Sequence, residues 1–268
     1  MPYVATRAGQ VFYAEQGAGL PVVLLHATLH DHTDFDAIAG PLAESGYRVL
    51  AVDWPGHGRS DTPADPRAIT AVLLAGVLAD LVTELDLPPA VFIGNSVGGY
   101  AAGRLALDQP GHVLGLVLVN TGGFVRPSRV IPRVIGIPAV SRVVLPRLVP
   151  GYMKPDSEPL RAITSRVQAR ARTRAGSAVG AALWRSFADP AYDLSADGHR
   201  LGAPALLIWG ERDINLPLSV ARQVQAAIPG AELRTHRTGH VVFAADPGGF
   251  LAEVMPFLAS VATSGRGR

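Results

Sequence analysis

Cysteine is absent from this sequence of 268 residues, and Lys154 is its only lysine. Without cysteine there can be no disulfide bond, thiol nucleophile or cysteine-ligated metal site, whatever the compartment. Long apolar runs are also missing, because none approaches the roughly 20 residues that a membrane-spanning helix needs. No secretory apolar segment follows Met1. We therefore expect a cytoplasmic protein without a membrane partner.

The chain does contain many short apolar runs, and hydrophobic residues make up 48% of it, enough for the core of one large domain. Tyr47–Asp53, Ala90–Gly94 and Leu114–Asn120 are nearly continuous apolar runs, which predict strands buried on both faces. Val11–Gln16 is expected to belong to an antiparallel edge hairpin. Helical stretches alternate with the strands, so the predicted fold class is α/β, with a mostly parallel sheet covered by helices on both faces.

The most informative motif is G-N-S-V-G at positions 94–98, which directly follows a predicted strand. A tight turn of this kind lifts the serine hydroxyl above the sheet edge, and its flanking positions must be glycine because a Cβ there would clash. Gly99 lets the following helix, which is expected to start near Val97, pack close to the sheet. The motif predicts Ser96 as a nucleophile.

A serine hydroxyl becomes reactive when a histidine removes its proton and an acid orients that histidine. Asp213 follows a second predicted strand, at 205–209, and His240 follows a third, at 231–236. Glu211 lies two positions before Asp213 and is the alternative acid. The candidate catalytic residues are therefore Ser96, Asp213 or Glu211, and His240.

With these motifs the chain resembles the α/β-hydrolase superfamily over nearly its whole length, from Pro21–His26 through Asp53–Ser60 to the last helix. That superfamily uses the chain order Ser, Asp, His for its triad. The resemblance favours Asp213 over Glu211, because the family's acid lies in a G-x-x-D turn. A second acid position used by some relatives is Asn120 here, which cannot serve as a carboxylate.

The resemblance also implies a domain organisation. An eight-stranded, mostly parallel sheet is expected from residues 1–121 and 204–262, with a helical lid at 122–203 and a disordered tail at 263–268. It implies neither a cofactor nor a metal.

The segment after the apolar run at 21–25 is expected to complete the oxyanion hole. His26 occupies the histidine of the superfamily's strand-end H-G element, although Ala27 replaces the glycine. By position, the backbone N–H of Thr28, or of Leu29, is the expected donor, paired with the N–H of Val97. Two such donors aimed at a developing oxyanion are usually the largest catalytic contribution, at roughly 3 kcal/mol each.

The same segment contains residue types that hold zinc, namely His26, His30, Asp31 and His32. Their spacing matches no metal motif, so we expect no metal there. We place His30 and His32 at the mouth of the pocket. Leu29, His30 and Asn95 are candidate contacts for the substrate.

Positive charge is concentrated in the expected lid: residues 122–200 hold 13 Lys and Arg against 5 Asp and Glu, whereas the net charge of the whole chain is +2. These side chains are either solvated or recognise an anionic small-molecule substrate or an acidic carrier protein. The first candidates for recognition lie just past the third buried strand; they are Arg126, Arg129 and Arg133. Three others should spread around a helix surface instead: Arg170, Arg172 and Arg174. No motif supports nucleic-acid binding, and the oligomeric state is left open.

The resemblance and the serine together favour hydrolysis of a carboxylic ester, lactone or thioester through an acyl-enzyme on Ser96. One alternative comes from the G-N-S-x-G-G form of the motif, which resembles carbon–carbon bond hydrolases acting on carboxylated ring-cleavage products. Another is a non-hydrolytic use of the same triad, in a lyase, a perhydrolase or a receptor.

Overall fold

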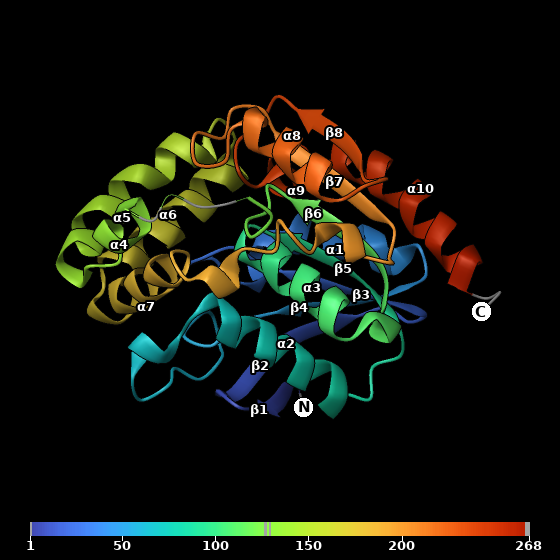
Figure 1. Cartoon of the computed structure of the whole chain (residues 1–268), viewed down its shortest axis with the longest axis horizontal. Helices are drawn as coiled ribbons and strands as arrows, with labels where there is room; N and C mark the ends of the chain where they lie inside the picture. The colour runs from blue at the N-terminus through green and yellow to red at the C-terminus, as the bar shows by residue number, and fades with distance from the viewer. Residues whose placement is uncertain (1, 126–127, 129, 266–268) are drawn as a thin grey trace.

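The computed structural model describes residues 2–125, 128 and 130–265, which form a sheet with helices on both faces (Figure 1). Within these residues the sheet has eight strands in the order β1-β2-β4-β3-β5-β6-β7-β8. The strands are Tyr3–Thr6 (β1), Gly9–Gln16 (β2), Leu20–Leu25 (β3), Tyr47–Val52 (β4), Ala90–Asn95 (β5), Val113–Val119 (β6), Ala205–Gly210 (β7) and Glu232–His236 (β8). The predicted fold class is confirmed.

Strand directions follow the sequence prediction closely. From β4 across to β8 every neighbouring pair is parallel. Strand β2 pairs antiparallel with both β1 and β4, which confirms the edge hairpin. Parallel strands place their carboxyl ends at one edge of the sheet, so the segments that follow β3, β5, β7 and β8 are brought together there.

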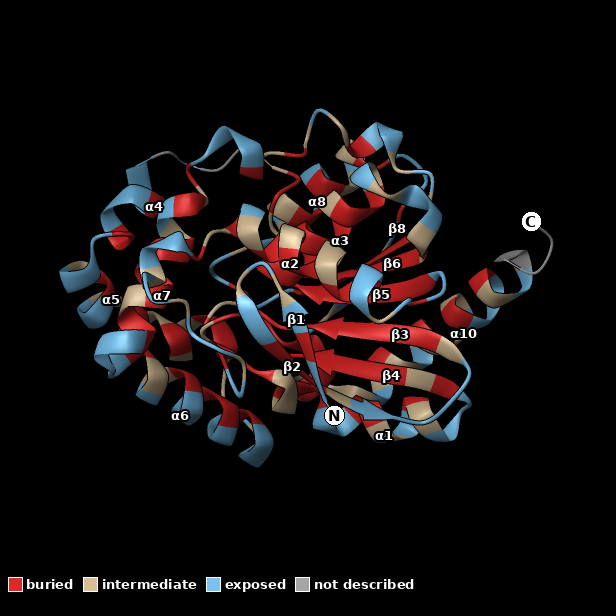
Figure 2. Ribbon diagram, turned by 90° about the horizontal axis from the view of Figure 1, so that it is seen from below, coloured by how far each residue is buried: buried red, intermediate tan, exposed pale blue. Residues whose placement is uncertain are grey.

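Each central strand sends alternate side chains into two separate cores, one on each face. Val23 and Leu25 of β3 pack in one core, and Val22 and Leu24 pack in the other. Both faces are covered, which explains the nearly continuous apolar runs, and Figure 2 shows the central strands buried along most of their length. The first core is covered by Ala71–Glu84 (α2), Val97–Asp108 (α3) and Leu218–Ala227 (α8), and the second by Asp36–Glu44 (α1), Val242–Ala245 (α9) and Pro247–Gly265 (α10).

Between β6 and β7 the chain forms a group of helices on one side of the sheet (Figure 1). They are Val130–Ile135 (α4), Pro138–Met153 (α5), Glu158–Arg172 (α6) and Arg174–Ser186 (α7). Helices α6 and α7 are separated by Thr173 alone. Its hydroxyl accepts a hydrogen bond from the N–H of Gly176, so it caps α7 and ends α6.

The C-terminal helix also differs from expectation. Helix α10 continues to Gly265, and so enters the segment 263–268 that the sequence predicted as a disordered tail. Residues 266–268 lie outside the described residues. Over the part of the chain that the structure describes, no helix is both long and apolar enough to cross a bilayer.

Candidate active site

Ser96 lies in a strained turn between β5 and α3. Its backbone has φ +55° and ψ −114°. A positive φ is energetically unfavourable for any residue that has a Cβ atom. Three backbone amides bond to its carbonyl oxygen, from Gly99, Tyr100 and Gly122, at 3.1 to 3.2 Å. The N–H of Val97 lies in the first turn of α3, where amides have no acceptor within the helix. The turn therefore places a nucleophile candidate beside a donor suited to an anion.

The glycines around Ser96 permit close backbone packing. A Cβ on Gly94 would lie 2.5 Å from the backbone of Gly98 and Gly99, and a Cβ on Gly98 would overlap the carbonyl oxygen of Leu25. A Cβ on Gly99 would meet the hydroxyl of Thr121. The steric reason inferred from the sequence pattern for these glycines holds at each position.

This packing makes a testable prediction for stability. We expect Gly98→Ala to lower the free energy of unfolding by at least about 2 kcal/mol, because the obstacle is a strand carbonyl that cannot rotate away. Urea unfolding followed by circular dichroism measures the change. Gly40→Ala is the control: it lies in α1 with open space around it, and should be neutral or stabilising by up to about 1 kcal/mol. Equal midpoints for Gly98→Ala and the unmodified protein would contradict the packing argument.

The structure places Asp213 against His240. Oδ2 of Asp213 lies 2.6 Å from Nδ1 of His240, and both side chains are buried. The same oxygen accepts a 2.8 Å hydrogen bond from Nδ2 of Asn120. Oδ1 accepts from the backbone amides of Asn215 and Leu216 at 2.8 and 3.3 Å. Because both oxygens of Asp213 accept from these donors, the atom of His240 that faces Oδ2 must itself be a donor, which places the imidazole proton on Nδ1.

Glu211, the alternative acid, lies elsewhere. It is exposed, and its Oε1 accepts a hydrogen bond from the hydroxyl of Thr235. Asn120, which the sequence only excluded as an acid, has a supporting role in the structure. Its Oδ1 accepts the N–H of Gly210 at 2.9 Å, and this fixes the amide so that its NH₂ group points at Asp213.

Asn95 was predicted to contact the substrate, and the structure contradicts this. Its side chain is buried, and Nδ2 donates to the carbonyl oxygens of Val119 and His240, both at 3.0 Å. The N–H of His240 donates to the carbonyl oxygen of Tyr152 at 2.9 Å. Asn95 and Tyr152 therefore hold the backbone of His240 from two sides. A sequence pattern cannot show this because the bonded groups are far apart along the chain.

The peptide group joining Ala27 and Thr28 is fixed in orientation by His26. Nε2 of His26 accepts the N–H of Trp54 at 3.1 Å, and its Nδ1–H donates to the carbonyl oxygen of Ala27 at 2.7 Å. Burial lowers the pKa of His26 to about 4, so the imidazole is neutral, as this pairing requires. The N–H of His30 donates to the same carbonyl oxygen. In a trans peptide the N–H points away from the C=O, so the N–H of Thr28 is directed away from these bonds.

Leu29 was the alternative oxyanion donor, and its N–H is already used. It donates to Nε2 of His57 at 3.0 Å, while Nδ1 of His57 bonds to the carbonyl oxygen of Pro55. Burial lowers the pKa of His57 well below its ordinary value, which keeps Nε2 as an acceptor. Thr28 and Val97 stay the predicted donors. Leu29 itself lines the cavity beside Ser96, as expected for a substrate contact.

His30 and His32 do not lie where the sequence prediction placed them. Nδ1 of His30 contacts Oδ2 of Asp34, and the imidazole is buried away from the cavity lining. Nδ1 of His32 lies 2.9 Å from both carboxylate oxygens of Asp53. Each histidine has its own carboxylate, and no three metal-ligating side chains converge anywhere in the described ranges.

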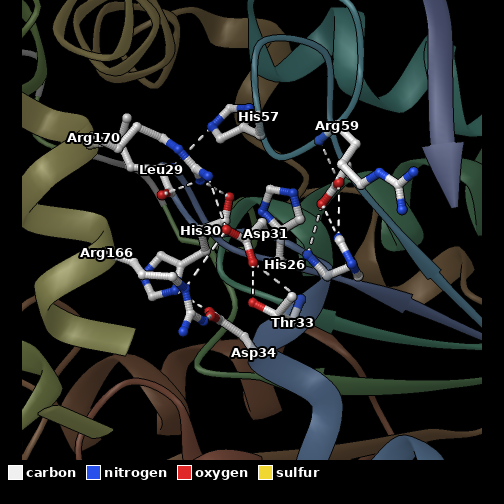
Figure 3. A network of polar contacts seen from close by, with 12 residues as sticks. His26, Leu29, His30, Asp31, Thr33, Asp34, His57, Arg59, Arg166 and Arg170 are labelled. Atoms are coloured by element: carbon white, nitrogen blue, oxygen red, sulfur yellow. Dashed lines mark hydrogen bonds and ion pairs between the residues drawn. The ribbon is translucent and has the colours of Figure 1, made fainter. Parts of the chain in front are cut away.

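The basic segment is only partly described, since Arg126 and Arg129 lie outside the described residues. Arg133 is exposed on α4. Arg172 and Arg174 are exposed, as expected, but the prediction for Arg170 is wrong. Its guanidinium points inward to the loop after β3 (Figure 3). Spacing along a helix shows which residues share a face, but not which face is packed.

A cavity of about 410 Å³ opens beside Ser96 and His240. Its wall is mainly apolar and includes an aromatic group of Tyr152, Trp184, Phe187 and Tyr192 that the sequence analysis did not identify. Burial raises the pKa values of Tyr152 and Tyr192, so both phenols are neutral. Among the described lining residues none is Lys, Arg, Asp or Glu.

Several known proteins are similar to this chain in sequence or in fold. The profile of the "Alpha/beta hydrolase family" matches residues 22–254. A 2-hydroxy-6-oxononadienedioate/2-hydroxy-6-oxononatrienedioate hydrolase from Cupriavidus pinatubonensis is 32% identical over 247 residues, 84% of this chain and 82% of that protein.

Two solved structures share the fold. An enol-lactonase from Burkholderia xenovorans LB400 superposes with a TM-score of 0.83 and 22% identity, covering 96% of this chain and 100% of its own. Est816, an N-acyl homoserine lactone degrading enzyme, superposes with a TM-score of 0.80 and 24% identity over the same shares.

Proposed function

This chain belongs to the alpha/beta hydrolase family, and we propose that it is a serine hydrolase of small, neutral carboxylic esters or lactones. The observation that carries the proposal is the pairing of His240 with Asp213 at the wall of the cavity that also contains Ser96. With Nδ1 protonated, Nε2 of His240 has the lone pair that a general base needs.

In the proposed reaction, Oγ of Ser96 attacks the substrate carbonyl while Nε2 of His240 takes its proton. The oxyanion that forms accepts hydrogen bonds from the N–H groups of Thr28 and Val97. Asp213 stabilises the imidazolium. Collapse of the intermediate expels the alcohol, which receives the proton from His240. Water then attacks the acyl-enzyme while Nε2 of His240 takes its proton. Collapse of the second intermediate releases the acid, and Oγ of Ser96 receives the proton back from His240.

The substrate class follows from the charge of the cavity wall. An ionised carboxylate that enters an apolar cavity without a cation loses hydration worth several kcal/mol. The described wall offers no guanidinium or ammonium group, and Arg166 and Arg170 are already paired with Asp34 and Asp31. A neutral acyl group therefore fits better than a carboxylated one.

A matched pair of esters tests the charge preference. We expect kcat/KM for p-nitrophenyl pentanoate to exceed that for mono-p-nitrophenyl glutarate by about 100-fold, because the two acyl chains have equal length and differ by one buried carboxylate. Initial rates of nitrophenolate release measure both. Equal turnover of the two esters would remove the neutral-substrate proposal.

A carbon–carbon bond hydrolase is the second candidate, supported by the 32% identity to the Cupriavidus pinatubonensis hydrolase. Its substrate would be a carboxylated vinylogous diketone, which needs a cation in the cavity. A preference for the glutarate ester that weakens with added salt would favour this candidate. It would also assign recognition of the substrate carboxylate to Arg126, Arg129 or Arg133.

A further inference from the structure

Helix α6 sends two arginines into the loop that follows β3. Nη2 of Arg166 lies 3.0 Å from Oδ1 of Asp34, and Nη2 of Arg170 lies 2.9 Å from Oδ2 of Asp31. Residues four apart on a helix share one face, so both guanidinium groups reach the same loop. Figure 3 shows these two arginines extending from the helix toward Asp31 and Asp34. The helical segment between β6 and β7 is thereby fastened to the loop that contains Thr28.

Arg170 also binds the backbone of this loop. Its Nη1 donates to the carbonyl oxygen of Leu29 at 2.7 Å and to that of His30 (Figure 3). The side chain is about a quarter exposed (23%), so these charge-assisted hydrogen bonds are only partly screened by water. Arg170 therefore bridges two successive carbonyl groups and Asp31 with a single planar group.

These contacts connect Arg170 to the predicted oxyanion donor through two peptide groups. The carbonyl of Leu29 and the N–H of His30 belong to one peptide group, and that N–H donates to the carbonyl oxygen of Ala27 at 3.2 Å. The carbonyl of Ala27 and the N–H of Thr28 belong to a second peptide group. Because each trans peptide is planar, fixing its C=O fixes its N–H. Hydrogen bonds therefore connect Arg170 to the Leu29–His30 peptide group, and that group to the Ala27–Thr28 peptide group.

We propose that Arg170 is a positioning residue for the oxyanion hole; this inference rests on the proposed function. Arg170 does two things at a distance from the substrate. Together with the Nδ1–H of His26, which donates to the Ala27 carbonyl, it holds the direction of the Thr28 N–H. Its positive charge polarises both peptide groups in turn, which makes that N–H a stronger donor. Hydrogen-bonded chains strengthen cooperatively in this way in a low-dielectric site. The helical segment thus contributes to catalysis as well as to the cavity wall.

Asp31 keeps the guanidinium in place. Burial raises the pKa of Asp31, but hydrogen bonds from Thr33 and the charge of Arg170 outweigh burial and hold that pKa well below its usual range. Asp31 is therefore ionised throughout the neutral range, and the contact with Arg170 does not change with pH there.

The test compares Arg170→Met, Arg170→Lys and Arg172→Met, the last being an exposed arginine of the same helix end. We expect Arg170→Met to lower kcat about 10- to 50-fold with KM changed less than twofold, somewhat less than removal of a direct oxyanion donor, which costs about 10²- to 10³-fold. Arg172→Met should match the unmodified enzyme. Arg170→Lys keeps the charge but cannot bridge all three acceptors, and should lie between.

A second readout separates positioning from general loosening of the fold. A trifluoromethyl ketone forms a tetrahedral oxyanion adduct with the serine, so its affinity should fall by the same factor as kcat/KM across the variants. Parallel losses would support the inference. A KM that rises with kcat unchanged, or ketone affinity that does not follow kcat/KM, would overturn it.

Two further outcomes are decided in the same experiment. If Arg170→Met does not fold, Arg170→Lys and Asp31→Asn supply the comparison, and full activity in both would overturn the inference. If the unmodified protein reacts with neither esters nor a fluorophosphonate, the proposed function fails, and the inference fails with it. An active unmodified enzyme with unaffected Arg170 variants contradicts the positioning role alone.

Discussion

Ser96→Ala should abolish covalent labelling by a fluorophosphonate and lower kcat for ester hydrolysis by about 10⁴-fold or more. The expected loss is large because triad members act as a unit, and without the hydroxyl there is no acyl-enzyme. Alanine keeps the Cβ of serine and loses only the hydroxyl, so the backbone at φ +55° is no more strained than before and the turn should persist. Labelling detected by mass spectrometry, together with initial rates on the pentanoate ester, measures both effects.

Ser128 supplies the matched control, because it is a serine that lines the same cavity, whereas its Oγ accepts hydrogen bonds from the backbone N–H groups of Val130 and Ile131. Ser128→Ala should keep its labelling. The far-ultraviolet circular dichroism of both variants should match that of the unmodified protein. Labelling that survives Ser96→Ala and disappears in Ser128→Ala would remove Ser96 from the proposed mechanism.

The elements of the sheet could be predicted from sequence because burial on both faces leaves a strong pattern. Strands β4, β5 and β6 lie within a residue or so of the runs that predicted them. The turn around Ser96 could be predicted for a different reason. Glycine is required at 94 and 98 by close backbone atoms and at 99 by the side chain of Thr121, so the steric requirement is visible in the residue types themselves.

Side-chain direction in loops could not be predicted in the same way. His30 and Asn95 lie one or two residues from groups at the cavity, yet both point into buried hydrogen bonds with Asp34 and with the backbone. Their partners are set by tertiary packing that no local pattern records. The inward position of Arg170 is a similar case, since α6 turns that face toward the loop after β3.

The two carboxyl groups near the end of β7 differ in a way that also needed the structure. Asp213 and Glu211 are both compatible with a turn after the strand, and only the resemblance favoured Asp213. In the structure the backbone amides of Asn215 and Leu216 hold one oxygen of Asp213, while its other oxygen meets His240. Glu211 is exposed to solvent, where its charge is screened.

Asp213→Asn should therefore lower kcat by about 10³- to 10⁴-fold at neutral pH. The backbone amides of Asn215 and Leu216 would retain the amide oxygen, so the new NH₂ group would face Nδ1 of His240 and the NH₂ of Asn120. Two donors cannot pair, and His240 would move its proton from Nδ1 to Nε2. The nitrogen needed as a general base would then have no lone pair.

Glu211→Gln is the matched control, since it makes the same chemical change two positions away and disturbs only an exposed contact with Thr235. We expect kcat within a few-fold of the unmodified enzyme, because exposed polar contacts of this kind contribute about 1 kcal/mol or less. Steady-state rates for both variants on the pentanoate ester decide between the two acids. A large loss in Glu211→Gln with little loss in Asp213→Asn would reverse the assignment, because only the carboxylate that orients His240 can have an effect of that size.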